Sequence, residues 1–139
     1  MKKVLVLCTG NSCRSQIAEG YLRNFASDVA DIYSAGIETH GVNPKAIQTM
    51  KADGIDISGH TSNHINEYVN VEFDYIITVC DHAKESCPYF PSKAVKLHQN
   101  FPDPAKATGT ESEIDVEFER VRNIIKVYNQ AFTQQYLKS

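Results

Sequence analysis

The first apolar run of the chain constrains the fold most. Residues Val4 to Leu7 form a short, continuous run that is apolar on both faces. Such a strand must be covered on both sides, which is typical of the interior of a parallel sheet. After a polar loop from Cys8 to Ser15, apolar side chains recur at three- and four-residue spacing until about Ala26. This spacing predicts a helix with one buried stripe.

Strand and helix signals alternate along the rest of the chain. Asn43 and Pro44 provide an N-cap and a first-turn proline for a second helix, which Gly54 ends. Thr110 and Glu113 have the spacing of a capping box at the start of a long last helix. The other expected elements are strands at 31–35, 75–79 and 94–97 and a weakly signalled short helix at 63–68.

This alternation predicts an α/β fold. The chain has 139 residues, 42% of them hydrophobic, which suffices for one core but not for two, so we expect a single domain over residues 1–139. Right-handed crossovers between parallel strands give a three-layer α/β/α sandwich with a four-stranded parallel sheet. Because the carboxyl ends of parallel strands meet at one edge, Cys8, Cys80 and Asp103 should converge there.

The loop after the first strand has the composition of an oxyanion site. A short loop around a tetrahedral oxyanion directs backbone N–H groups inward, and the following helix adds its positive N-terminal end. Gly10 and Asn11 tolerate the positive φ that such a loop needs, and the planar Arg14 guanidinium holds two oxygens at once. These surroundings should lower the pKa of Cys8 and create a thiolate nucleophile. The expected oxyanion-binding residues are Thr9, Gly10, Asn11, Ser12, Cys13, Arg14 and Ser15.

A cysteine followed after five residues by Arg14 and Ser15, directly behind a strand, resembles the signature of the low-molecular-weight protein tyrosine phosphatase fold. The resemblance implies that Cys8 is the nucleophile and that Arg14 binds the oxyanion. Ser15 has two compatible roles, donation of its hydroxyl to the thiolate or capping of the first helix. Cys13 is interpreted mainly as a small loop residue.

A second pair of cysteines, Cys80 and Cys87, follows the strand at 75–79. Phosphate ester hydrolysis has no use for this pair, whereas removal of oxygen from an oxyanion needs two electrons, which a dithiol supplies as it becomes a disulfide. With this pair the chain resembles the thioredoxin-coupled arsenate reductases, and the likeness extends through residues 33–47 and 103–105.

This second resemblance implies a relay of three thiols. Cys8 attacks arsenate, Cys80 then forms a disulfide with Cys8 as arsenite leaves, and Cys87 next forms a disulfide with Cys80. Thioredoxin would reduce that last disulfide. The segment 81–87 must move for this exchange, because one rigid arrangement cannot bring all three cysteines within disulfide distance of one another.

Asp103 lies between Pro102 and Pro104, which stiffen the backbone around it. The resemblance implies that this carboxyl is the general acid that protonates the leaving hydroxide. Phosphatases of this fold commonly carry an aromatic residue after the Asp-Pro pair, whereas Ala105 follows here. This departure favours a small inorganic substrate.

Other functions remain open at this point. A low-molecular-weight protein tyrosine phosphatase would use the same loop and Asp103, and a non-catalytic oxyanion-binding redox sensor would keep the thiols without needing the acid. Zinc binding by the four cysteines leaves Arg14 unexplained and needs a wide gap between Cys80 and Cys87, so we expect no metal. His60 and His64, four residues apart, are assigned no chemistry.

The expected partners are arsenate and thioredoxin. With 14 basic and 17 acidic residues spread along the chain, nucleic acid is not expected, and no apolar run is long enough to span a membrane or form a signal peptide. We therefore expect a cytoplasmic monomer without a bound cofactor. Some relatives bind potassium beside the loop, at positions that correspond to Asn11, Glu19 and Ser34, but position 63, acidic in some of them, is Asn63 here.

Overall fold

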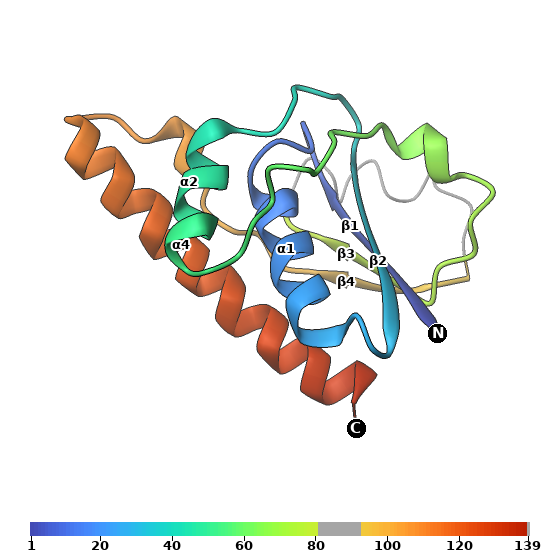
Figure 1. The fold of residues 1–139 in the computed structure, drawn as a ribbon. Coiled ribbons are helices and arrows are strands. Elements are labelled where there is room, and N and C mark those ends of the chain that lie inside the picture. The colour runs from blue at the N-terminus through green and yellow to red at the C-terminus, as the bar shows by residue number, and fades with distance from the viewer. Residues whose placement is uncertain (81–92, 139) are drawn as a thin grey trace.

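The computed structural model describes residues 1–80 and 93–138, and its centre is a sheet of four parallel strands (Figure 1). The strands are β1 (Lys2–Cys8), β2 (Ala30–Gly36), β3 (Tyr75–Thr78) and β4 (Val95–His98). Their order is β2-β1-β3-β4, so β1 has a neighbour on each side. The predicted interior position of the first strand is confirmed, because Val4 to Leu7 are fully buried.

Three α-helices pack together on one side of this sheet (Figure 1). They are α1 (Arg14–Ala26), α2 (Pro44–Ala52) and α4 (Glu111–Phe132). Short turns of helix lie at Ile65–Tyr68, Pro104–Lys106 and Thr133–Leu137. In the part of the chain that the structure describes, no helix is long and apolar enough to cross a membrane.

An aromatic cluster packs against the other face of the sheet at β2. Side chains alternate between the two faces of a strand, so Tyr33 points away from Ile32 and Ser34, both of which contact α1. The Tyr33 ring packs edge to face on Tyr68 and Phe73, with centroid distances of 5.3 Å to each. The predicted α/β fold with a parallel sheet covered on both sides is therefore confirmed.

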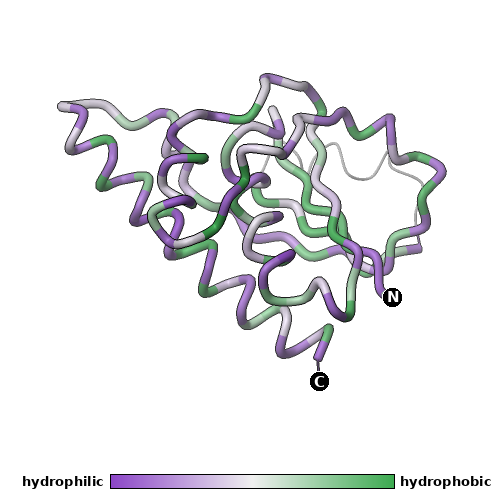
Figure 2. The backbone as a smooth tube through the Cα atoms, viewed as in Figure 1, coloured by the Kyte–Doolittle hydropathy of each residue, from purple (hydrophilic) through white to green (hydrophobic). Residues whose placement is uncertain are grey.

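Local sequence signals define two of the helix starts. The Asn43 side chain accepts a hydrogen bond from the Lys45 N–H, with Pro44 in the first turn, and Thr110 forms a reciprocal capping box with Glu113. Both caps were predicted from spacing alone. Figure 2 shows hydrophobic colour along much of the interior strands and an alternation of hydrophobic and hydrophilic colour along α4.

The first helix differs from its prediction in two ways. It was expected to bury one stripe, but every side chain from Ser15 to Leu22 is buried, including the polar Gln16 and Glu19. The expected N-cap role of Ser15 is also wrong, because the helix begins at Arg14, its N-cap is Cys13, and no side chain caps it. Gln16 and Glu19 are buried because they contact other segments of the chain, Gln16 at Thr61 and His60 and Glu19 at Ser34.

Candidate active site

The loop between β1 and α1 turns its carbonyl groups outward. Each of four successive carbonyl oxygens accepts a hydrogen bond from a segment that lies outside the loop. In a planar trans peptide the C=O and the next N–H point in opposite directions, so the N–H groups of residues 10–13 face the inside of the loop. The four acceptors and their donors are Thr9 (Glu38 N–H), Gly10 (His40 N–H and Ser62 Oγ), Asn11 (Gln16 Nε2) and Ser12 (Asn43 N–H).

The backbone of the loop needs one left-handed residue. Asn11 has φ of 46°, which an asparagine adopts more readily than most residues. Gly10 is not in the left-handed region, contrary to what its sequence position suggested, and a different constraint acts on it. A Cβ atom at this position would lie 2.4 Å from Cδ2 of His40. Asn11 therefore supplies the turn of the loop, and Gly10 leaves room for the His40 ring in its present position.

Arg14 and Asp103 lie together at the mouth of the loop although 89 residues separate them in the sequence. The Arg14 Nη1 donates to the Phe101 carbonyl at 2.9 Å, and its Nη2 lies 3.7 Å from Asp103 Oδ2. Asp103 is itself held by the Ala105 N–H, 3.0 Å from its Oδ1. The guanidinium and the carboxyl are thus both fixed at the carboxyl edge of the sheet, where the sequence predicted convergence.

Two thiols meet at the same edge. Cys8 ends β1 and Cys80 follows β3, which pairs directly with β1, and the two side chains are hydrogen-bonded to each other. Thr9 Oγ1 lies 3.1 Å from the Cys80 sulfur, and both cysteines are almost completely buried. The third cysteine of the predicted relay, Cys87, lies outside the described residues.

The expected low pKa of Cys8 does not occur in this arrangement. The hydrogen bond with Cys80 raises the pKa of Cys8 most, and burial raises it further. The Arg14 guanidinium and the Thr9 N–H lower the pKa, but they do not outweigh the first two effects. Burial likewise raises the pKa of Cys13 to about 12, with a further contribution from Asp103. The sequence prediction counted the positive loop and omitted the second thiol.

Ser15 lies beneath the loop. In the described part of the chain its hydroxyl is hydrogen-bonded to Asn11 and not to the Cys8 sulfur. It is fully buried, and its hydroxyl accepts a hydrogen bond from Asn11 Nδ2 at 2.8 Å. The sequence reasoning also missed Gln16, Arg23 and His60, which contact the groups below the loop. Nothing in their spacing marks them, because a glutamine or arginine in a helix is usually a solvent-exposed residue.

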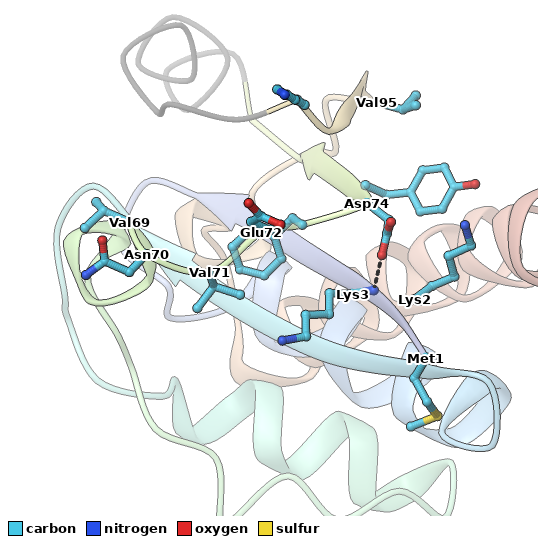
Figure 3. Close-up of a pocket in the computed structure, with 12 residues that line it drawn as sticks. Met1, Lys2, Lys3, Val69, Asn70, Val71, Glu72, Asp74 and Val95 are labelled. Atoms are coloured by element: carbon cyan, nitrogen blue, oxygen red, sulfur yellow. Dashed lines mark hydrogen bonds between the residues drawn. The ribbon is translucent and has the colours of Figure 1, made fainter.

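A wide groove of about 1170 Å³ lies at the opposite, amino-terminal edge of the strands (Figure 3). Lys2, Glu72, Asp74 and Val95 are among its lining residues, and the Lys3 N–H donates to Asp74 Oδ2 at 2.8 Å. Among the described residues, both basic and acidic side chains line the groove and no cysteine does. Ligand sites of open parallel sheets lie at the carboxyl ends of the strands, so the chemistry belongs to the loop and not to this groove.

Comparisons with known proteins agree with this geometry. The family model described as low molecular weight phosphotyrosine protein phosphatase matches residues 3–139. An arsenate reductase of Halalkalibacterium halodurans is 50% identical over 124 residues, which cover 89% of each chain. An arsenate reductase of Staphylococcus aureus strain Newman is 47% identical over 126 residues, covering 91% of this chain and 92% of the relative.

Solved structures show the same fold. An arsenate reductase in its oxidized state superimposes with a TM-score of 0.84 at 29% identity, over 97% of this chain and 98% of the other. A tyrosine phosphatase from Erwinia amylovora superimposes with a TM-score of 0.82 over 99% of this chain and 94% of the other, at 20% identity, which shows likeness of fold alone.

Proposed function

Because the chain belongs to the low molecular weight phosphotyrosine protein phosphatase family, and its relatives at 46–50% identity are arsenate reductases, we propose that it reduces arsenate to arsenite with its own thiols. The observation that carries the proposal is the position of Cys80 beside Cys8 at the start of the oxyanion loop, where the Cys80 sulfur lies 3.1 Å from Thr9 Oγ1. A phosphatase needs one thiol there, and a reductase needs two.

The loop supplies binding and the first bond. The inward N–H groups and the Arg14 guanidinium hold the arsenate oxygens, while the Cys8 sulfur attacks arsenic and forms a sulfur–arsenic bond. One oxygen leaves as water after Asp103 donates a proton to it. Cys8 must lose its own proton before the attack, and Arg14 and the Thr9 N–H are the groups that favour this loss.

The second thiol completes the reduction. The Cys80 sulfur, as a thiolate, attacks the Cys8 sulfur, and the electron pair of the sulfur–arsenic bond stays on arsenic, which leaves as arsenite. Two thiols are thereby oxidised to one disulfide while arsenic gains two electrons. In the proposed relay Cys87 then attacks Cys80 and releases Cys8 as a thiol, and reduced thioredoxin returns two electrons to the Cys80–Cys87 disulfide.

The proposed cycle also needs an electron donor and a reducing compartment. A dithiol that is oxidised at every turnover must be reduced again, and thioredoxin and its reductase do this in a reducing compartment. We therefore propose a cytoplasmic protein that acts as a monomer and depends on a thioredoxin-like donor. No bound organic cofactor takes part in these steps.

The test is arsenite formation coupled to NADPH oxidation through thioredoxin and thioredoxin reductase, with hydrolysis of p-nitrophenyl phosphate measured in parallel. We expect multiple turnovers for the unmodified protein, at most one for Cys87→Ser, and none for Cys80→Ser. Cys8→Ser, the control for both reactions, should lose reduction and ester hydrolysis together. Ester hydrolysis without any arsenate-dependent NADPH oxidation would reject the reductase and identify a phosphatase.

A further inference from the structure

A network of buried polar groups lies directly under the oxyanion loop. Asn11 Nδ2 donates to Ser34 Oγ at 2.9 Å, and Ser34 donates in turn to Glu19 Oε1 at 2.5 Å. Asn11 Oδ1 accepts the Asn63 N–H at 2.7 Å. Asn11, Glu19 and Ser34 are the positions that correspond to the potassium site of some relatives, so the network tests whether this chain can hold the same ion.

The carboxylate of this network already has a positive partner. The side chain of Glu19 is only 8% exposed, and its Oε2 lies 2.8 Å from Arg23 Nε. Arg23 is fixed on its other side, where Nη2 donates to the Ile32 carbonyl at 2.7 Å. A buried carboxylate needs a charged partner to offset its loss of hydration, and here a residue one helical turn away provides it.

The same network returns to the loop along a second path. His60 Nε2 lies 3.5 Å from Glu19 Oε2, and His60 Nδ1 is 2.9 Å from Gln16 Oε1. Gln16 Nε2 donates to the Asn11 carbonyl at 3.0 Å. The contacts therefore form a closed ring that starts at the Asn11 side chain and ends at the Asn11 backbone.

The oxygens of the ring are used by protein donors. Among the described residues, the only buried side-chain nitrogen or oxygen without a hydrogen-bond partner is Thr133 Oγ1, which belongs to the C-terminal turn and not to the ring. A potassium ion is held by oxygen lone pairs, and Glu19 and Asn11 direct theirs at N–H and O–H groups. Because the Arg23 guanidinium already neutralises Glu19, and Asn63 adds no second carboxylate, the residues present in this chain do not fit the ion on grounds of charge.

We propose that Arg23 replaces a monovalent cation in this protein, as a positioning residue that neutralises Glu19 and keeps the ring closed beneath the oxyanion loop. The ring fixes the Asn11 peptide, because Gln16 holds its carbonyl outward, and the Ser12 N–H points inward as a result. Among the described residues, loss of Arg23 leaves the buried Glu19 carboxylate with no arginine or lysine partner, and the neighbouring His60 is a poor substitute because burial lowers its pKa. This inference rests on one part of the proposed function, the binding of an oxyanion by the loop, and does not depend on arsenate reduction.

The experiment compares Arg23→Gln with Arg120→Gln. Arg120 is a matched control, because it is also an arginine of a helical ion pair, with Glu117, and its side chain is 53% exposed against 52% for Arg23. Two quantities are measured for each protein, the Tm in KCl and in choline chloride of equal concentration, and the Kd of inorganic phosphate from its stabilising effect.

For the unmodified protein and for Arg120→Gln we expect the same Tm in both salts and the same phosphate Kd. For Arg23→Gln in choline chloride we expect a Tm lower by about 5 °C and a phosphate Kd about tenfold weaker. Potassium should restore part of the lost Tm and part of the lost phosphate affinity, because in this variant the ion can neutralise the unpaired negative charge of Glu19. A purely structural surface ion pair would give no potassium-specific recovery.

A potassium-specific rise in the Tm of the unmodified protein would overturn the inference. So would an Arg23→Gln variant with the same Tm and phosphate Kd as Arg120→Gln. A lower Tm of Arg23→Gln without any change in its phosphate Kd would overturn it as well. Arsenate turnover enters none of these readouts. A protein that showed the expected pattern but no arsenate reduction would refute the proposed function and leave the role of Arg23 supported.

Discussion

Thr9 contacts both thiols of the candidate active site. Its hydroxyl lies 3.1 Å from the Cys80 sulfur, and its backbone N–H donates to Cys8. The two cysteines are in turn hydrogen-bonded to each other. At the scale of single residues, the acidity of Cys8 is therefore set by its neighbouring thiol as much as by the cationic loop.

Replacement of the second thiol tests this electrostatic balance. In Cys80→Ala the largest effect that raises the pKa of Cys8 is removed, so that pKa should fall and more thiolate should be present near neutral pH. The rate of Cys8 alkylation by iodoacetamide, followed by mass spectrometry against pH, should therefore shift toward lower pH. If the alkylation profile of Cys80→Ala lay at the same pH as that of the unmodified protein, or at a higher pH, burial alone would set the pKa of Cys8.

Gly36 is a second residue on which the loop depends. A Cβ atom there would lie 2.5 Å from the Glu38 carbonyl oxygen and 2.7 Å from both the Asn11 nitrogen and the Thr9 oxygen, all of them backbone atoms that cannot swing away. Gly36→Ala should lower the free energy of unfolding by about 2–3 kcal/mol, in the range of an overpacked core, and weaken phosphate binding.

The control for this substitution is Gly59→Ala, where an added Cβ meets nothing within 4 Å. Urea unfolding of both variants measures the difference. Equal stability of Gly36→Ala and Gly59→Ala would show that the loop and the segment after β2 can separate without cost.

Among the secondary-structure elements, α4 is the helix whose start and buried face follow most directly from the local sequence. Thr110 Oγ1 accepts the Glu113 N–H and Glu113 Oε1 accepts the Thr110 N–H, both at 3.2 Å. The apolar side chains that recur at three- and four-residue spacing along the helix then pack inward, with Phe118, Val121, Ile125 and Phe132 buried. Periodicity and capping agree along this helix, so its position in the sequence could be predicted without tertiary information.

The cap makes a measurable contribution to stability. Thr110→Ala removes the side-chain acceptor of the capping box and should destabilise the protein by about 1 kcal/mol, which for a chain of this size corresponds to a Tm lower by about 3 °C. Ser112→Ala, an exposed position in the same turn, should leave the Tm unchanged. A Thr110→Ala variant as stable as Ser112→Ala would mean that the first turn contributes nothing to folding.

The first helix shows where prediction from the element alone fails. Apolar spacing located α1 correctly, but the single buried stripe that it predicted does not account for the burial of the polar Gln16 and Glu19. Their burial results from contacts with Asn11, Ser34 and His60, which belong to other segments of the chain. A polar side chain in a helix carries no local mark of whether such partners will be present.

At the scale of the whole molecule, parallel topology brings the acid to the loop. The β3–β4 pairing places Phe101 against the end of β3, where its N–H donates to the Val79 carbonyl, and Asp103 follows two residues later. Arg14 then bridges the Phe101 carbonyl and the Asp103 carboxyl. The candidate active site is thus assembled from both halves of the chain.

This assembly predicts a specific defect for Asp103→Asn. The amide keeps the size of the side chain but cannot donate the proton, so the kcat of arsenate reduction should fall by about a hundredfold, while the Kd of arsenate should stay the same or become slightly tighter near Arg14. Turnover in the coupled thioredoxin assay and binding by thermal shift measure the two quantities. An unchanged kcat would remove Asp103 from the reaction.

Local sequence patterns were enough to predict the secondary-structure elements and the chemical types of the site residues. The apolar run at Val4 to Leu7, the two caps and the helical stripes depend on contacts between near neighbours, and a cysteine followed by Arg14 after a strand identifies an oxyanion loop because the spacing is local. The tertiary structure alone decided which distant groups meet. It placed Cys80 beside Cys8, which raises the pKa that the loop was expected to lower. It also closed a ring through Gln16, Glu19 and His60 beneath the loop, with Arg23 paired to Glu19. Acidity and burial are properties of surroundings drawn from the whole chain, so local patterns cannot specify them.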